Sequence, residues 1–186
     1  MLKTVCMIIV SIIILFVLSF QVMPVAVGMD VGKAPFLRLL SGILLLVLGQ
    51  LLLFLLGVWL GDKFMHLLVH MKKYVLLVGF FLIAVRFNME AFKVRKGERT
   101  YMIGKSSTYI LPAIAQAVNN FLAGILFYYL PVSLAKDIIY LAIFSLAFSI
   151  LFALIKNKKL ALPAISFLYM VGGGLLMAIS FYFLFV

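Results

Sequence analysis

The chain has 186 residues, of which 67% are apolar and 11% charged, and its formal net charge is +11. A soluble domain of this length does not use so much apolar surface, which excludes an ordinary soluble protein. The Lys and Arg residues lie in short segments beside apolar blocks rather than on one basic face. The charge therefore indicates contact with the headgroups of a lipid bilayer and not with nucleic acid.

Six apolar blocks follow one another along the chain. They cover residues 5–27, 39–60, 74–92, 108–130, 135–155 and 160–186. A bilayer core about 30 Å thick takes roughly 20 helical residues to cross, and each block is close to that length. Runs such as 43–48 and 51–56 lack the alternating polarity of membrane β-strands. The sequence predicts an all-α integral membrane protein, a single transmembrane domain of six transmembrane helices over residues 1–186.

The first block has an alternative interpretation. Lys3 followed by an apolar run is also the pattern of a secretory signal peptide. The run at 5–20 is longer than the apolar region of such a peptide, and no clear small-residue cleavage site follows it. We therefore expect an uncleaved first helix. Cys6 is the only cysteine, so no disulfide forms within the chain.

The basic residues predict an orientation. With six crossings, loops 1, 3 and 5 share one side and carry ten Lys and Arg, against five on the other side. The ten are Lys33, Arg38, Lys93, Arg95, Lys96, Arg99, Lys105, Lys156, Lys158 and Lys159, and the five are Lys3, Lys63, Lys72, Lys73 and Lys136. Because basic loops stay in the cytoplasm, loops 1, 3 and 5 are predicted to be cytoplasmic. Both termini are then outside a plasma (inner) membrane.

The basic loop at 93–107 divides the chain into two halves of three helices, about 1–92 and 108–186. An odd number of helices in each half turns the second half upside down relative to the first. The halves also echo each other, since Gln21 precedes Gly28 in helix 1 as Asn119 precedes Gly124 in helix 4. Two inverted repeats with a binding site between them are a common plan of secondary transporters.

A small polar set interrupts the apolar blocks. Its members are Gln21, Gln50, Arg86, Glu90, Gln116, Asn119 and Asn120. The spacing of 116, 119 and 120 places those three amides on one face of helix 4. Polar groups inside a bilayer are costly unless paired, and they often mark an ion or substrate pathway. The alternative is that the amides are ordinary interhelical contacts.

The polar residues of helices 1 and 3 lead to more specific predictions about cation ligands. Pro24 has no N–H, so the carbonyl of Phe20 is expected to lie unpaired beside Gln21 and to be a ligand for a hard cation. Arg86 and Glu90 are four residues apart and can form an ion pair on one face of helix 3. Glu90 is expected to be the only carboxylate inside a helix, which makes it the candidate cation ligand or proton carrier.

Glycines indicate close contacts between helices. Gly172, Gly173 and Gly174 in helix 6 predict tight packing first and a hinge second. Gly42, Gly49, Gly57 and Gly61 in helix 2 suggest the same.

These residues resemble the small six-helix manganese efflux pumps, the MntP-like family. Ser19-Phe20-Gln21-Val22 is similar to the first motif of that family, with Gln21 in place of an aspartate. Gln50 occupies the position of a glutamate in the helix 2 motif of that family, and the following run Gly57-Val58-Trp59-Leu60-Gly61 resembles the rest of the motif. The run 86–92 resembles the end of helix 3 in that family, with a basic residue followed by Glu-x-Phe. Asn119 occupies the position of the aspartate in the family's helix 4. Only Glu90 remains acidic.

The resemblance implies a secondary transporter that exports a divalent cation such as Mn²⁺, with Glu90, Gln21, Gln50 and Asn119 as metal ligands. Mn²⁺ prefers carboxylate and carbonyl oxygens, and the amides keep the oxygen but lose the charge. A less charged substrate, a non-transporting scaffold or regulatory subunit, and an exporter of amino acids or other small solutes remain alternatives. No enzyme motif or cofactor site is visible, and a homo-oligomer stays open.

Overall fold

The structure, a computed structural model, describes residues 2–29, 36–97, 110–155 and 158–185. These residues are mostly helical and include no strand. The elements in chain order are α1 (Leu2–Leu18), η1 (Ser19–Val22), α2 (Met23–Gly28), α3 (Phe36–Phe64), η2 (Met65–Met71), α4 (Lys72–Arg95), α5 (Ile110–Phe127), α6 (Leu134–Ala153) and α7 (Lys158–Phe185). Residues 98–107 of the basic loop, with Arg99 and Lys105, lie outside the described residues, as do Lys33 and Lys156.

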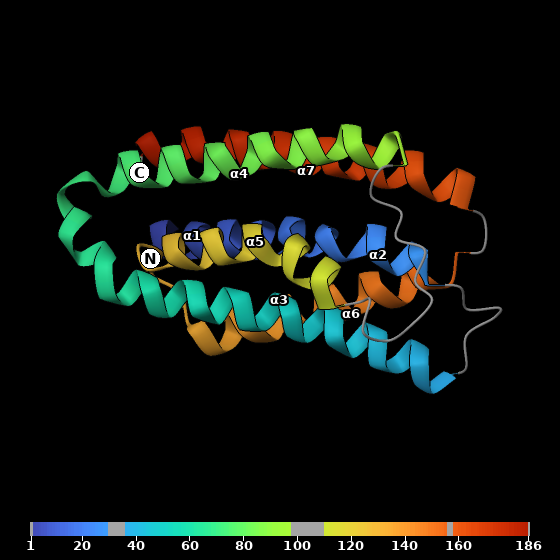
Figure 1. Cartoon of the computed structure of the whole chain (residues 1–186). Helices are drawn as coiled ribbons and strands as arrows, with labels where there is room; N and C mark the ends of the chain where they lie inside the picture. The colour runs from blue at the N-terminus through green and yellow to red at the C-terminus, as the bar shows by residue number, and fades with distance from the viewer. Residues whose placement is uncertain (1, 30–35, 98–109, 156–157, 186) are drawn as a thin grey trace.

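The helices form a bundle in which α4 packs along α7 and α3 packs along α5. In Figure 1 the α4–α7 pair covers one side, α1, α2 and α5 occupy the middle, and α3 and α6 lie on the opposite side. The continuous segment α1–η1–α2 packs against α6 along its length. Both termini lie at one end of the bundle, together with η2 (Figure 1).

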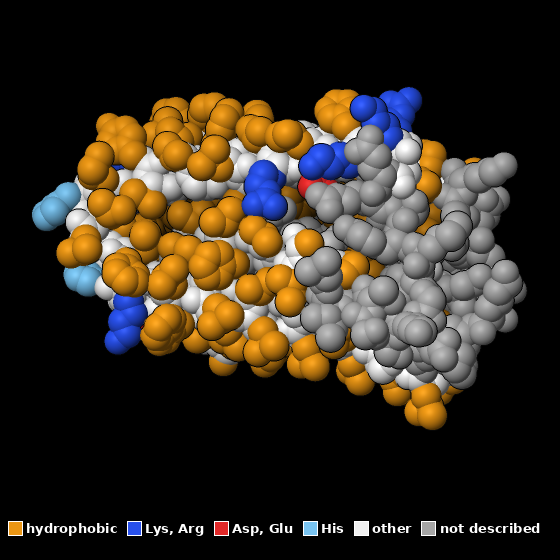
Figure 2. Space-filling model, viewed as in Figure 1, with side chains coloured by type: hydrophobic (Ala, Val, Ile, Leu, Met, Phe, Trp, Pro, Cys, Tyr) orange, Lys and Arg blue, Asp and Glu red, His pale blue; other side chains and the backbone are white. Residues whose placement is uncertain are grey.

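The outer surface of the bundle is apolar. Large hydrophobic side chains are exposed on the long helices, for example Trp59, Leu82, Ile139 and Phe167. Figure 2 shows these side chains covering most of the described part of one face, with Lys and Arg gathered where α4 ends. A soluble monomer does not expose apolar surface on this scale, so the surface is compatible with a surrounding bilayer.

Four stretches of the described chain are long and apolar enough to cross a membrane: Val5–Gly28, Leu39–Arg95, Leu134–Ala153 and Leu160–Phe185. The second has 57 residues and folds into the hairpin of α3 and α4 (Figure 1). Its turn is η2, where Leu68 leaves helical geometry with φ −108° and ψ 17°. The helix Pro112–Phe127 is apolar but shorter. Helical architecture is therefore confirmed, and six separate crossings stay a prediction.

The first crossing contains a local change of helix type at η1. Pro24 lies in the first turn of α2 and has no N–H, so it cannot bond the carbonyl of Phe20. The chain tightens to a 3₁₀ turn instead, and the N–H of Met23 bonds that carbonyl. The expectation of an unpaired Phe20 carbonyl is therefore wrong.

Glycines bring α3 and α5 into backbone contact. A Cβ on Gly57 would overlap the carbonyl oxygen of Phe121, and a Cβ on Gly124 would overlap that of Phe54. A Cβ on Gly61 would stand 2.7 Å from the carbonyl oxygen of Ile125. Close packing of α3 is confirmed at these positions, because only glycine lets two helix backbones approach so closely. Gly49 makes only an ordinary contact with Ala113.

The α4–α7 pair is closed by small and polar groups. A Cβ on Gly173 would stand 2.7 Å from the side-chain nitrogen of Asn88, so close packing is confirmed at this member of the glycine run. Gly174 has nothing within 4 Å of such a Cβ, so packing does not require glycine there. The Ser166 hydroxyl donates to the carbonyl of Ala91 at 2.8 Å. The α4 helix ends at Arg95, and Gly97 follows it with a φ of 75°, a left-handed conformation that favours glycine.

Candidate polar cavity in the bundle core

The side chain of Gln21 anchors the polar interior. It projects from η1, is 2% exposed, and its Nε2 donates to the Leu18 carbonyl at 3.0 Å and to the Asn120 Oδ1 at 3.0 Å. A backbone carbonyl only accepts hydrogen bonds, so the Leu18 contact fixes which end of the Gln21 amide is the nitrogen. The Gln21 Oε1 is thereby fixed as well, and it is buried without a partner in the described chain.

An amide chain continues from Gln21 across the bundle. The Asn120 Nδ2 donates to the Gln50 Oε1, so η1, α5 and α3 are joined through Gln21, Asn120 and Gln50. All three side chains are buried, with Gln50 and Asn120 fully so. The chain ends at the Gln50 Nε2, which has no partner among the described residues. These bonds tie three elements together in the buried interior of the bundle, which makes them structural contacts.

A small polar cavity lies beside the amide chain. Its volume is about 10 Å³, and its lining consists of Gln21, Arg86, Glu90, Ala115, Gln116, Asn119 and Tyr169. The lining comes from η1, α4, α5 and α7, so both halves of the chain contribute. A volume near 10–15 Å³ holds about one water molecule. The cavity accommodates a single water or a bare ion and nothing larger.

The oxygens around this cavity are mostly unsatisfied. Besides the Gln21 Oε1, the Gln116 Oε1 and the Asn119 Oδ1 are buried and lack hydrogen-bond partners in the described residues. Buried polar atoms normally find partners, and an exception calls for a missing water or ion. Three acceptor oxygens around one cavity suit a donor or a cation, since neutral amide oxygens coordinate hard cations.

Charged groups line the same cavity. Glu90 is 19% exposed at its side chain and forms an ion pair with Lys93, one turn further along α4, at 3.5 Å. Arg86 lines the cavity from the preceding turn. The described lining thus holds one guanidinium and one carboxylate, and the carboxylate is paired with the Lys93 ammonium. No ion pair joins Arg86 to Glu90 in the described chain, so a dication would enter with little compensating negative charge. Among the described residues, no group of three His, Cys, Asp or Glu is arranged to hold a metal ion.

Most of the residues selected from the sequence meet in this region. Gln21, Arg86, Glu90, Gln116 and Asn119 line the cavity. Gln50 and Asn120 belong to the amide chain instead, and the Gln50 oxygen already accepts a hydrogen bond. Of the four residues selected as metal ligands, the structure therefore brings Gln21, Glu90 and Asn119 to the cavity but not Gln50.

Two residues were missed from the sequence. Tyr169 lines the cavity and stacks on Phe87 with ring centroids 5.1 Å apart, and a lone tyrosine in an apolar helix gives no signal of this role. Asp137 is 3% exposed inside α6, so the expectation that Glu90 is the only carboxylate inside a helix is wrong. Its place within the predicted helix 135–155 was the available signal.

Comparisons with protein-family models, with curated proteins and with solved structures found no match to this chain.

Alanine variants of the adjacent residues Asn119 and Asn120 distinguish the cavity lining from the amide chain. We expect Asn120→Ala to lower the stability of the purified protein by about 1–2 kcal/mol, because it removes both hydrogen bonds that join Gln21 to Gln50. Asn119→Ala removes the same number of atoms one position away but no hydrogen bond, so its loss should be smaller by about 1 kcal/mol, the contribution of a typical hydrogen bond. Thermal unfolding in detergent measures both. Equal losses would contradict the division into two sets.

Proposed function

We propose that this chain is a membrane transporter for a small cation of single charge, with the polar cavity as its closed binding site. The observation that carries the proposal concerns the lining of a cavity the size of a single ion. Three of its side chains carry buried amide oxygens without a partner among the described residues, and a fourth is a carboxylate. The resemblance to manganese efflux pumps supports the architecture. The charges favour a different substrate, and export from the cytoplasm is the direction that the resemblance implies.

The argument against Mn²⁺ is electrostatic. At an effective dielectric of about 20, two unit charges 4 Å apart interact by roughly 4 kcal/mol, and a dication doubles each contact. Arg86 lines the cavity, so repulsion offsets the attraction of Glu90. A singly charged ion carries half of this penalty and still gains the amide oxygens. If Glu90 acts as a proton carrier, its carboxylate takes up a proton when the cation leaves the cavity.

An arrangement of two inverted repeats supports alternating access. Each half contributes one helix to the α4–α7 pair, and the contact of α3 with α5 has its counterpart in the contact of α6 with α1–η1–α2. These are the contacts that a two-fold axis between the halves would relate. The 3₁₀ turn η1 also fits, because transporters place irregular helix segments at their binding sites.

Six crossings with both termini outside are part of this proposal. The α3–α4 hairpin supplies two crossings, and α5, 18 residues long, spans about 27 Å at 1.5 Å per residue. We expect a green fluorescent protein fused to either terminus to stay dark after export, and alkaline phosphatase fused there to be active. A fusion within residues 98–107 should behave in the opposite way. Cytoplasmic termini would contradict the orientation.

Cation-dependent stability tests the binding site. We expect the unfolding temperature of the purified protein to rise in Li⁺, Na⁺ or K⁺ relative to choline at equal ionic strength, because choline is too large for the cavity. Stabilisation reaches about 2.7 kcal/mol when the ion is at 100 times its dissociation constant. Mn²⁺ should add nothing beyond ionic strength. An unfolding temperature that does not depend on the cation would contradict the proposal.

A non-transporting scaffold is the second candidate, and the amide chain is the observation that favours it. The bonds among Gln21, Asn120 and Gln50 are those of interhelical contacts and need no substrate. This candidate leaves the unpaired oxygens of Gln116 and Asn119 without a purpose. In the cation experiment a scaffold gives the same unfolding temperature in every salt.

A further inference from the structure

Asp137 occupies an unusual place for a carboxylate in this chain. It lies in the first turn of α6 and is buried, and no hydrogen bond or ion pair holds its side chain in the part of the chain that the structure describes. Five residues of the whole sequence are acidic, so one of them buried in an apolar bundle needs a reason. Buried carboxylates in membrane helices generally face a water-filled cavity or an ion path.

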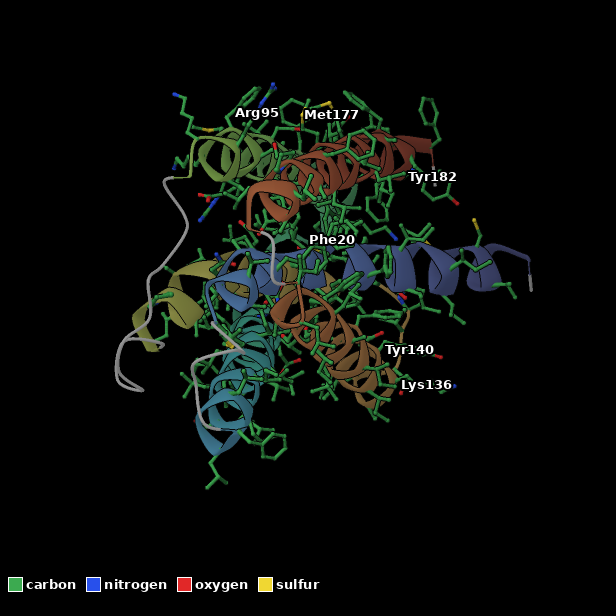
Figure 3. All side chains as sticks on the ribbon, turned by 90° about the vertical axis from the view of Figure 1, so that its right-hand side faces the viewer. Phe20, Arg95, Lys136, Tyr140, Met177 and Tyr182 are labelled. Atoms are coloured by element: carbon green, nitrogen blue, oxygen red, sulfur yellow. The ribbon has the colours of Figure 1, made fainter. Side chains whose placement is uncertain are left out.

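Two hollows flank Asp137. One has a volume of about 250 Å³, lies between α1 and α6, and includes Ser11, Ser133, Lys136 and Tyr140 in its lining. The other, of about 680 Å³, lies towards α3 and is mostly apolar. In Figure 3 Lys136 and Tyr140 project from the same side of α6. The smaller hollow therefore gives Asp137 polar surroundings, at the end of the bundle where both termini lie.

Two serines continue from Asp137 along α6. Asp137, Leu141, Ser145 and Ser149 are all buried and follow at four-residue intervals, the spacing of one ridge on a helix. The hydroxyls of Ser145 and Ser149 have no hydrogen-bond partner among the described residues. Ser11, Ser19 and Ser180 each donate to a carbonyl three residues earlier, which is how serines in this bundle usually satisfy themselves. The two serines of α6 depart from that rule.

The row leads towards the bundle core. From 137 to 149 it covers about 18 Å at 1.5 Å per residue, more than half of a bilayer core. Phe148, next to Ser149, contacts the ring of Phe20 with centroids 5.2 Å apart, and Phe20 precedes Gln21 in η1. Figure 3 places Phe20 near the middle of the bundle. Ser149 therefore lies at the depth of η1.

We propose that the face of α6 formed by Asp137, Ser145 and Ser149 is the outward path of the transported cation, with Asp137 as the cation-binding group at its mouth. The inference deepens the proposed function and rests on it. Three observations carry it: the hollow at the outer end, the unpaired serines in the middle, and the contact with η1 at the inner end. The path is closed in this state, since both serines are fully buried.

Cysteine accessibility tests the path without measuring transport. In a Cys6→Ser background, Ser145→Cys and Ser149→Cys are near-isosteric, and Ile143→Cys and Leu146→Cys are matched controls on the exposed apolar face of the same stretch of α6. A membrane-impermeant cationic thiol reagent is added to intact cells. We expect it to modify the two serine positions at least tenfold faster than the controls, because the path opens to outside water.

The outcomes separate this inference from the proposed function. Labelling of Ser145→Cys and Ser149→Cys supports a water-accessible path along α6 even if the wild-type protein shows no cation flux. Absence of flux would contradict the proposed function, and with it the use of this path by a cation. Labelling no faster than at Ile143→Cys and Leu146→Cys overturns the path even when flux is present. Labelling only in inverted vesicles overturns it as well, since the serines would then open to the cytoplasm.

Discussion

Alanine in place of Gly57 is expected to give the largest loss of stability of any single methyl group added to this chain. The new Cβ overlaps the Phe121 carbonyl on α5, and neither backbone can move aside as a flexible side chain can. Overpacking of this kind costs about 1–3 kcal/mol, and backbone against backbone belongs at the upper end. In a protein of this size the unfolding temperature should fall by about 5 °C or more.

The α3–α5 contact offers a second position, and α7 offers a control. Gly124→Ala should give a similar loss, because its Cβ overlaps the Phe54 carbonyl from the opposite helix. Gly174→Ala adds the same methyl group where nothing lies within 4 Å, and alanine favours the helix by up to about 1 kcal/mol. Thermal unfolding in one detergent compares the three. Equal stability of Gly57→Ala and Gly174→Ala would contradict the packing described for α3 and α5.

The second large effect is expected at Glu90. Glu90→Gln keeps the shape and one oxygen but removes the only carboxylate among the described residues that line the cavity. At an effective dielectric of about 20 a contact between unit charges is worth a few kcal/mol before solvation offsets it, and 1.4 kcal/mol is tenfold in affinity. We expect cation flux through the purified, reconstituted protein to fall at least about tenfold.

Lys93 provides the matched control for Glu90. Lys93→Gln breaks the ion pair at 3.5 Å but leaves the carboxylate in place, and half-exposed pairs of this kind contribute little to stability. Flux should stay within about twofold of the wild type, since the cavity keeps its charge. If Glu90→Gln transports as well as Lys93→Gln, Glu90 is neither a cation ligand nor a proton carrier.

The apolar blocks were enough to predict the helices, because each is a long run without alternation and ends near a charge, glycine or proline. The helix pairing was not predictable. Leu and Phe surround these helices on every side, so no apolar stripe indicates which face meets a neighbour. Glycines came closest, since Gly57 and Gly61 at four-residue spacing mark the face that α3 presents to α5.

The sequence predicted most residues of the candidate site, but not which of them belong to the amide chain and which line the cavity. Spacing placed Gln116, Asn119 and Asn120 on one face of α5, yet adjacent residues differ by about 100° around a helix. That angle turns Asn120 to the amide chain and Asn119 to the cavity. Asp137 was passed over because it follows Lys136 at a helix start, where charges are ordinary. Burial distinguishes it, and burial is a property of the folded bundle.

The most direct test of the central claim is cation flux into sealed liposomes that contain only this purified protein. Vesicles without protein give the background, and Li⁺, Na⁺, K⁺ and Mn²⁺ are compared under the same gradient. A cavity with unpaired amide oxygens and balanced side-chain charges predicts entry of at least one singly charged ion well above background, with Mn²⁺ excluded. Background flux for every singly charged ion, or selective passage of Mn²⁺, would contradict it.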